Sequence, residues 1–111
     1  MEKSRPDDIR GRVLNVTELV GYRKSSIVSR ILLKKESGNV TMFSFDKGEA
    51  LSEHTAPFDA MVMVVDGEAE ITIAKKSRKV RKGELIIMPA NVPHAVKAVK
   101  KFKMSLVMLK K

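Results

Sequence analysis

The chain has 111 residues, which is the usual size of one domain and allows a single hydrophobic core. Hydrophobic residues make up 43% of it, which is typical of a globular protein and not of a disordered one. Cysteine is absent, so disulfides, thiolate metal sites and cysteine nucleophiles are excluded.

Lys and Arg total 22 against 13 Asp and Glu, which gives a formal net charge of +9. This balance is typical of proteins with nucleic-acid or other anionic partners. The densest basic segment, residues 75–82, contains no aromatic residue that could stack on a base. A solvated hairpin explains such a segment, and a nucleic-acid partner is therefore not expected.

No apolar run reaches the roughly 18 residues that a membrane-spanning helix needs. The first ten residues also lack the apolar stretch of a signal peptide. The sequence therefore predicts a cytoplasmic protein with no membrane partner.

Residues 1–24 are expected to form an N-terminal arm, which leads into a domain over residues 25–111. The arm begins with a polar, charged stretch that includes Pro6. Within it, the composition predicts one short helical turn over residues 15–21, with Thr17 as its cap and Gly21 as its stop.

From residue 25 onward, short runs rich in Val, Ile, Met and Phe alternate with turn residues, which predicts an all-β domain. The Asp66-Gly67 pair favours a hairpin, because glycine tolerates positive φ, and antiparallel pairing follows. The expected strands span residues 25–34, 39–46, 50–54, 59–66, 68–74, 78–82, 85–89, 93–98 and 101–109.

The strand expected at residues 59–66 differs from the others because residues 60–65 are all apolar. A strand that is apolar on both faces needs a covering layer on each. We expect a homodimer interface over Met61, Met63 and Val65 to cover the outer face, while a strand of the arm or an outer sheet of the same chain is the alternative.

Gly48, His54 and Gly67 follow one another at a spacing that resembles the first motif of the cupin family. That motif runs G, five residues, H-x-H, three or four residues, E, six residues, G. The resemblance implies a cupin fold, which is a double-stranded β-helix or jelly-roll barrel of antiparallel strands.

Gly83, Pro89 and His94 resemble the second cupin motif, which runs G, five residues, P-x-G, two residues, H, three residues, N. Asn91 stands in place of its glycine and Ala98 in place of its asparagine. The two motif stretches together cover about a third of the chain, and the resemblance is to a small single-domain cupin.

In metal-binding cupins, the first motif supplies two His and one Glu and the second supplies one His. Carried over, these ligands correspond to His54, Ala56, Ala60 and His94, so only the two histidines could bind a divalent metal such as Zn, Mn, Fe or Ni. Such sites normally need three or more protein ligands. The resemblance also implies a ligand pocket inside the barrel, lined by His54, His94, Ala56, Ala60 and Val62.

Glu53 and Asp59 are the carboxylates nearest to the motif positions that lack a ligand. On regular strands they point away from the pocket, because successive side chains alternate between the two faces. A bulge, or the bend at Pro57, is needed to turn Asp59 inward.

Three functions remain open. The first choice is a cupin domain that binds a small molecule between His54 and His94. The alternative is a metal-dependent or acid-base enzyme on the same fold, such as an isomerase or an oxygenase, because imidazole can transfer protons near neutral pH. A nucleic-acid-associated basic protein is the third, and only the charge supports it.

Overall fold

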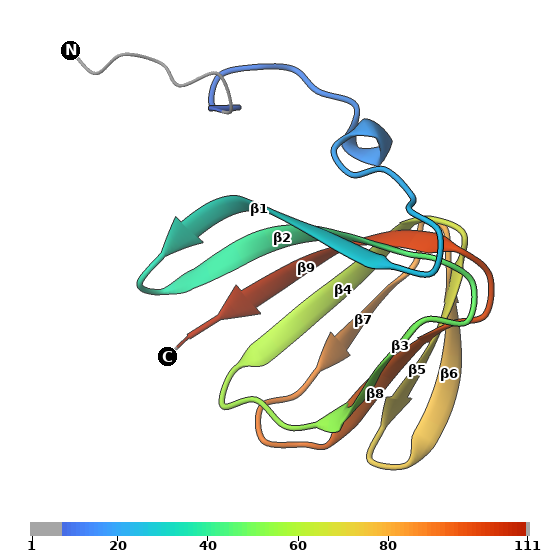
Figure 1. Ribbon diagram of the computed structural model, residues 1–111. Helices are drawn as coiled ribbons and strands as arrows, with labels where there is room; N and C mark the ends of the chain where they lie inside the picture. Colours follow the sequence, from blue (N-terminus) through green and yellow to red (C-terminus); the bar gives the residue numbers. More distant parts are fainter. Residues whose placement is uncertain (1–7, 111) are drawn as a thin grey trace.

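The structure is a computed structural model in which residues 8–110 are described. Within these residues, the strands form two sheets that lie face to face (Figure 1). One sheet has five strands in the order β1-β2-β9-β4-β7, and the other has four in the order β3-β8-β5-β6. In chain order the elements are the short 3-10 helix η1 (Val16–Glu18), β1 (Ile27–Lys35), β2 (Gly38–Phe45), β3 (Ala50–His54), β4 (Asp59–Asp66), β5 (Glu68–Ile73), β6 (Lys76–Arg81), β7 (Leu85–Met88), β8 (His94–Ala98) and β9 (Phe102–Leu109).

All paired strands of both sheets run antiparallel, which confirms the predicted all-β, antiparallel fold. The largest differences from the predicted strands are two residues, at β1, which begins at Ile27, and at β6, which begins at Lys76. Ala74 and Lys75, with φ of 50° and 68°, form the tight turn between β5 and β6. Two-residue hairpin turns of this kind require positive φ, and the sequence lacks the Asn-Gly signal that usually marks them. No helix within residues 8–110 has the length and hydropathy needed to cross a membrane.

The hydrophobic core fills the space between the two sheets. Phe45 of β2 and Phe102 of β9 stack at its centre, with ring centroids 4.6 Å apart, and both are fully buried. Val62 of β4 and Ile71 of β5 bring the two sheets together over the same core. Burying each such side chain stabilises the fold by about 1.5–3 kcal/mol.

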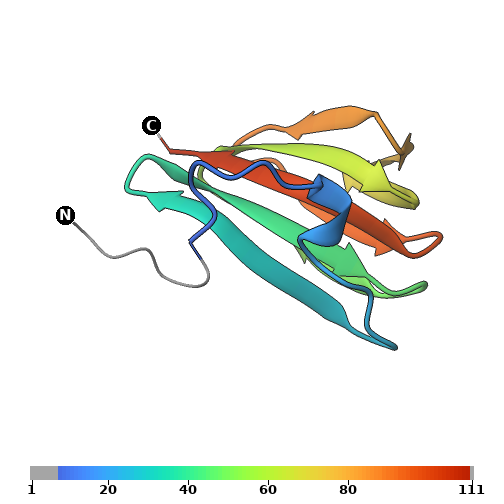
Figure 2. The same ribbon diagram turned by 90° about the horizontal axis from the view of Figure 1, so that it is seen from above.

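The second half of the arm packs on the outer face of the five-stranded sheet (Figure 2). The Ser44 hydroxyl donates a hydrogen bond to the Gly21 carbonyl at 2.7 Å, and Arg30 donates to the Leu19 carbonyl at 3.3 Å. Asn15 caps η1 by accepting a hydrogen bond from the Thr17 backbone N–H, so the expected cap at Thr17 was wrong by two residues.

Tyr22 fixes the end of the arm where it meets the sheet. Its hydroxyl donates to the Asp66 carboxylate, and the Lys101 and Lys103 ammonium groups each lie 4.8 Å from its ring centroid. Burial, together with the hydrogen bond to Asp66, raises the pKa of Tyr22. The arm is thus bound to the sheet by directional contacts as well as by apolar packing.

Within the described part of the chain, the arm contacts β4 through η1 but leaves apolar side chains of β4 and β7 exposed on the outer face. Ala60, Val62 and Val64 point into the core, so Met61 and Met63 point outward from the same strand. Met63 is 36% exposed, and Leu85 and Ile87 of β7, its neighbouring strand, are 51% and 56% exposed. Together with the partly buried Val65, these side chains form the apolar surface that we call the outer patch: Met61, Met63, Val65, Leu85 and Ile87.

Candidate functional site

His54 and His94 lie side by side although 40 positions separate them in the sequence. His54 is the last residue of β3 and His94 the first residue of β8, and the antiparallel register pairs them directly. Their Nε2 atoms are 3.2 Å apart. We call this end of the two sheets, where β3 and β7 end and β4 and β8 begin, the histidine end (Figure 1).

A turn at Asn91 joins the loop that precedes His94 to the loop that follows His54. Asn91 has a φ of 63°, in the left-handed region that Gly and Asn adopt most easily. Its backbone N–H donates a hydrogen bond to the Ala56 carbonyl at 2.8 Å. Asparagine therefore performs the conformational role of the glycine that stands at this position of the second motif.

Each histidine ring is oriented by a backbone carbonyl near it. The Nδ1 atom of His54 lies 2.8 Å from the Ser52 carbonyl oxygen, and that of His94 lies 3.1 Å from the Val92 carbonyl oxygen. Because a carbonyl oxygen can only accept, both Nδ1 atoms carry the hydrogen. Both Nε2 atoms then face each other, in rings whose planes are inclined by 69°.

The two histidines differ in their access to solvent. The His94 residue is 5% exposed, whereas His54 is an exposed residue at the end of its strand. The pair is therefore open to small molecules from the His54 side, while His94 closes its inner side.

The other expected pocket residues are distributed around this pair. Ala60 and Val62 lie on the inner face of β4 and belong to the packed core. Ala56 lies in the loop before β4, half-buried, where its carbonyl accepts from Asn91. The structure thus brings the two histidines together and places Val62 deeper, beneath the histidine end.

The residues present do not complete a metal site. Residues 8–110 contain no cluster of three or more His, Cys, Asp or Glu side chains, and alanines occupy two of the four ligand positions of metal-binding cupins. Asp59 is engaged by the Ala90 backbone N–H, which donates to its carboxylate at 2.8 Å. Glu53 lies in a bulge of β3 and is exposed. Two imidazoles alone hold a divalent metal weakly.

The strand register adds two residues, Ile73 and Lys76, that the sequence analysis did not assign to the site. His94 pairs with Ile73 of β5, and Ile73 pairs with Lys76 of β6. Directly paired residues of antiparallel strands share one face, so His54, His94, Ile73 and Lys76 form one row across the four-stranded sheet. A two-residue turn at Ala74 and Lys75 pairs Ile73 with Lys76 directly. The sequence does not predict this turn, because neither Ala nor Lys is a usual turn residue.

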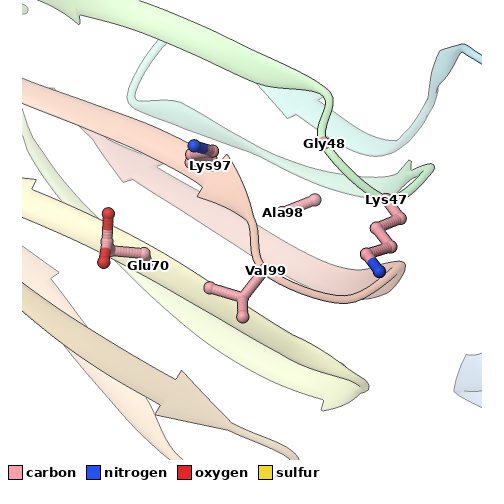
Figure 3. Close-up of a pocket in the computed structure, with 6 residues that line it drawn as sticks. All are labelled: Lys47, Gly48, Glu70, Lys97, Ala98 and Val99. Carbon is pink, nitrogen blue, oxygen red and sulfur yellow. The ribbon is translucent and has the colours of Figure 1, made fainter.

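A surface hollow of about 320 Å³ lies at the opposite end of β8 (Figure 3). Lys97 and Glu70 are paired across β8 and β5 on the solvent face of the sheet. Lys47, Gly48, Ala98 and Val99 complete its lining. None of the expected pocket residues takes part in this hollow, which is thus separate from the histidine pair.

Comparison with known proteins identifies the fold family. Residues 41–110 match the cupin domain family. A conserved protein of unknown function from Streptococcus pyogenes is 40% identical, with a TM-score of 0.87 over 91% of this chain and 89% of its own. A cupin 2 conserved barrel domain protein from Leptotrichia buccalis is 44% identical, with a TM-score of 0.85 over 87% of this chain but 47% of its own.

A cupin superfamily protein from Desulfitobacterium hafniense is 26% identical, with a TM-score of 0.87 over 92% of this chain and 94% of its own. A search of curated proteins gave no significant match. These similarities concern the fold and the strand framework, and no activity comes with them.

Proposed function

Because the chain belongs to the cupin domain family, we propose that it binds a small molecule at the histidine end of its barrel. The observation that carries this proposal is the direct approach of the His54 and His94 Nε2 atoms at 3.2 Å. Among residues 8–110, the two Nε2 atoms have no hydrogen-bond partner other than each other, so a ligand that inserts beside the rings can engage them.

The surroundings of the pair support a binding role. The exposure of His54 gives access from solvent, and the apolar residues of β4 and β5 beneath it exclude water from the inner side. Ligand sites are commonly apolar surfaces with a few oriented polar groups, and the carbonyl-anchored imidazoles are such groups. The ligand set argues against a resident metal, so binding is assigned to the imidazoles themselves.

An acid-base enzyme is a second candidate for the same site. The facing Nε2 atoms support it, because one imidazole can accept a proton while the other donates one. This candidate requires turnover of the bound molecule, whereas a binding domain does not. No metal-assisted step is assigned, because the described residues contain no cluster of three metal-binding side chains.

The experiment is native mass spectrometry of protein purified without an affinity tag, followed by identification of any released molecule. We expect a small organic molecule to accompany the wild-type protein and to be lost from His54→Gln, whose exposed position leaves the core intact. Metal analysis of the same sample should give clearly less than one divalent ion per chain. Retention of the molecule by His54→Gln, or one tightly held metal per chain, would contradict the proposal.

We also propose that a second copy of the chain covers the outer patch. All five of its residues lie on β4 and β7, two adjacent strands at one edge of the five-stranded sheet. This chain spans about half of the length of the Leptotrichia relative. A twofold homodimer, the commonest closed assembly of soluble proteins, would cover the outer patch with the same patch of a second copy.

A further inference from the structure

A row of apolar side chains crosses the whole outer face of the five-stranded sheet. The register pairs Leu33 with Val40, Val40 with Val107, Val107 with Met61, and Met61 with Ile87. Directly paired residues of antiparallel strands share one face, and Met61 and Ile87 belong to the outer patch. We call these five residues, one from each strand, the cross-sheet row.

A β-bulge places the first member of this row on the outer face. Ile31 of β1 pairs with Thr41, which shares the inner face with its other partner, Leu106. The register then shifts, so that Leu33 pairs with Val40. Without the bulge, Ile31 and Leu33 would share one face, because they are two positions apart. The two side chains are 58% and 49% exposed, on opposite faces of the same strand.

The cross-sheet row is open to solvent at both of its ends. Leu33 on one edge strand and Ile87 on the other are exposed, and the three residues between them are half-buried by their neighbours. Leu109, which lies in the next row on the same face, is 63% exposed. Contiguous exposed apolar side chains of this kind mark an interface, whereas single exposed apolar residues do not.

The arm covers another part of the outer face and leaves the row open. Ser44 is fully buried and donates to the Gly21 carbonyl where the arm packs on the sheet (Figure 2). Before η1, by contrast, Val13 is fully exposed and Leu14 is partly exposed, and this segment stands away from the sheet (Figure 1). The arm therefore does not bury the row, and it has exposed apolar side chains of its own.

The cross-sheet row has no charged member, although the net charge of the chain is +9. The nearest charged residues by register lie in the rows on either side. Lys35 and Asp59 flank Leu109 in one of these rows, and Arg30 lies in the other, where it donates to the Leu19 carbonyl. Two copies of a strongly cationic chain repel each other, so they associate most easily through a surface without like charges.

The area of the surface distinguishes a narrow interface from a wide one. Strands lie about 4.8 Å apart and rise about 3.4 Å per residue, so five residues of β4 and β7 offer a flat area of about 150 Å². The same length of all five strands offers about 400 Å². Since a stable interface buries roughly 800 Å² of accessible surface on each partner, β4 and β7 alone are too small. Five strands approach this area, because projecting side chains expose more surface than a flat sheet.

We infer that two copies of the chain pack outer face to outer face along the whole cross-sheet row, with the twofold axis at Val107. This inference rests on the homodimer proposed above and extends its interface from the β4–β7 edge to Leu33 on the opposite edge strand. Val107 is the middle member of the row, so a twofold axis there places it next to Val107 of the second copy. Each row then covers the other.

Leu33→Asp and Ile31→Asp form a matched pair of variants on the two faces of β1. Leu33→Asp should raise the dissociation constant of the dimer at least about tenfold, because twofold symmetry buries the unpaired charge twice. Ile31→Asp adds the same charge on the inner face and should leave the constant unchanged within experimental error. Sedimentation velocity over a dilution series measures both constants, and thermal unfolding checks that both variants are folded.

Val107→Cys tests the position of the axis while it preserves an apolar side chain in the interface. The chain contains no cysteine, so a thiol-specific cross-linker can join only two copies of this variant. Facing sheets lie about 10 Å apart, which a short bis-maleimide spans and a direct disulfide does not. We expect a high yield of cross-linked dimer from Val107→Cys. Lys79→Cys, on the solvent face of the other sheet, should give only a background level.

The outcomes separate the wide interface from the homodimer itself. A monomeric wild-type protein contradicts the homodimer and the inference together. If Ile87→Asp dissociates the dimer and Leu33→Asp does not, the homodimer stands on the β4–β7 edge and the wide interface is refuted. Equal effects of Leu33→Asp and Ile31→Asp, or equal cross-linking of Val107→Cys and Lys79→Cys, also refute it.

Discussion

The backbone N–H of Asn91 donates to the carbonyl oxygen of Ala56 at 2.8 Å, and this bond joins the loop that precedes His94 to the loop that follows His54. The left-handed conformation of Asn91 directs its N–H toward Ala56. The hydrogen bond therefore helps to hold the two histidines, which are far apart in the chain, side by side at their strand ends.

Replacing Asn91 tests this link. Asn91→Gly should keep the fold stability within about 0.5 kcal/mol, because glycine adopts positive φ freely. Asn91→Ala should cost about 1 kcal/mol, because a Cβ without a polar side chain disfavours that region. Urea unfolding measures both values, and a larger loss in the glycine variant would mean that the Asn91 side chain, not its backbone, holds the turn.

Gly67 and Gly83 offer a matched test of steric requirement in the motif turns. Both have positive φ, 76° and 86°. A Cβ at Gly67 would overlap the Lys101 carbonyl oxygen and lie 2.8 Å from the Cα of Phe102, whereas at Gly83 it would meet nothing within 4 Å. Gly83→Ala should therefore cost about 1 kcal/mol for its backbone conformation alone.

Gly67→Ala should cost about 3 kcal/mol or more, because the Lys101 backbone must move as well. The free energies of unfolding in urea give both numbers. Similar losses in the two variants would show that the β4–β5 turn can move away from Lys101 at little cost.

Asp46 should make fold stability depend on pH in the acid range. The backbone N–H groups of Ser25 and Lys47 donate to its carboxylate at 2.7 and 2.9 Å and hold its pKa below its usual value. Its contribution to stability is therefore complete above the pKa of the unfolded chain, about 3.9, and is lost as pH falls through the lower folded value. Asp46→Asn removes that contribution.

The thermal unfolding midpoints of the wild-type protein and Asp46→Asn should differ most near neutral pH and converge as the pH falls below about 4. Asp8 is a less suitable position for such a test, because its partner Arg10 lies outside the barrel in the exposed arm. If the two midpoints instead differ by the same amount from neutral pH to pH 3, the Asp46→Asn effect comes from shape or hydrogen-bond geometry and not from the charge of Asp46.

The outer patch should control association of the chain with itself. Ile87 of β7 and Ile31 of β1 are 56% and 58% exposed and lie on opposite edge strands of the same sheet. Ile87→Asp should convert a homodimer to a monomer, because a charge cannot be buried in an apolar interface without a partner. Ile31→Asp should leave the dimer intact.

Sedimentation velocity at micromolar concentration distinguishes the two species. A wild-type protein that sediments as a monomer under these conditions would contradict the dimer proposal, and so would a dimer that only Ile31→Asp disrupts.

The sequence by itself determined the strands. An extended backbone places successive side chains on opposite faces, so a half-buried strand shows alternating polar and apolar residues within a short segment. Nine short runs predicted the nine strands that the two sheets contain among residues 8–110, with ends close to those of the structure, although the run at residues 60–65 is apolar on both faces and does not alternate. The spacing of Gly48, His54, Gly83 and His94 also predicted the fold family, which the match over residues 41–110 confirms. The positions of the turn glycines and of the strand-end histidines can be predicted from sequence spacing, because each lies within one short segment of turn and strand.

Only the tertiary structure decided which residues surround the histidine pair. The position of Lys76 in the row depends on the β5–β6 register, and the engagement of Asp59 by Ala90 depends on two loops that are distant in the sequence. The coverage of Ser44 by the arm depends on where the arm docks. These contacts depend on how segments far apart in the chain pair with one another. The free energy of that pairing comes from cross-strand packing and burial, which the local pattern of residues does not determine.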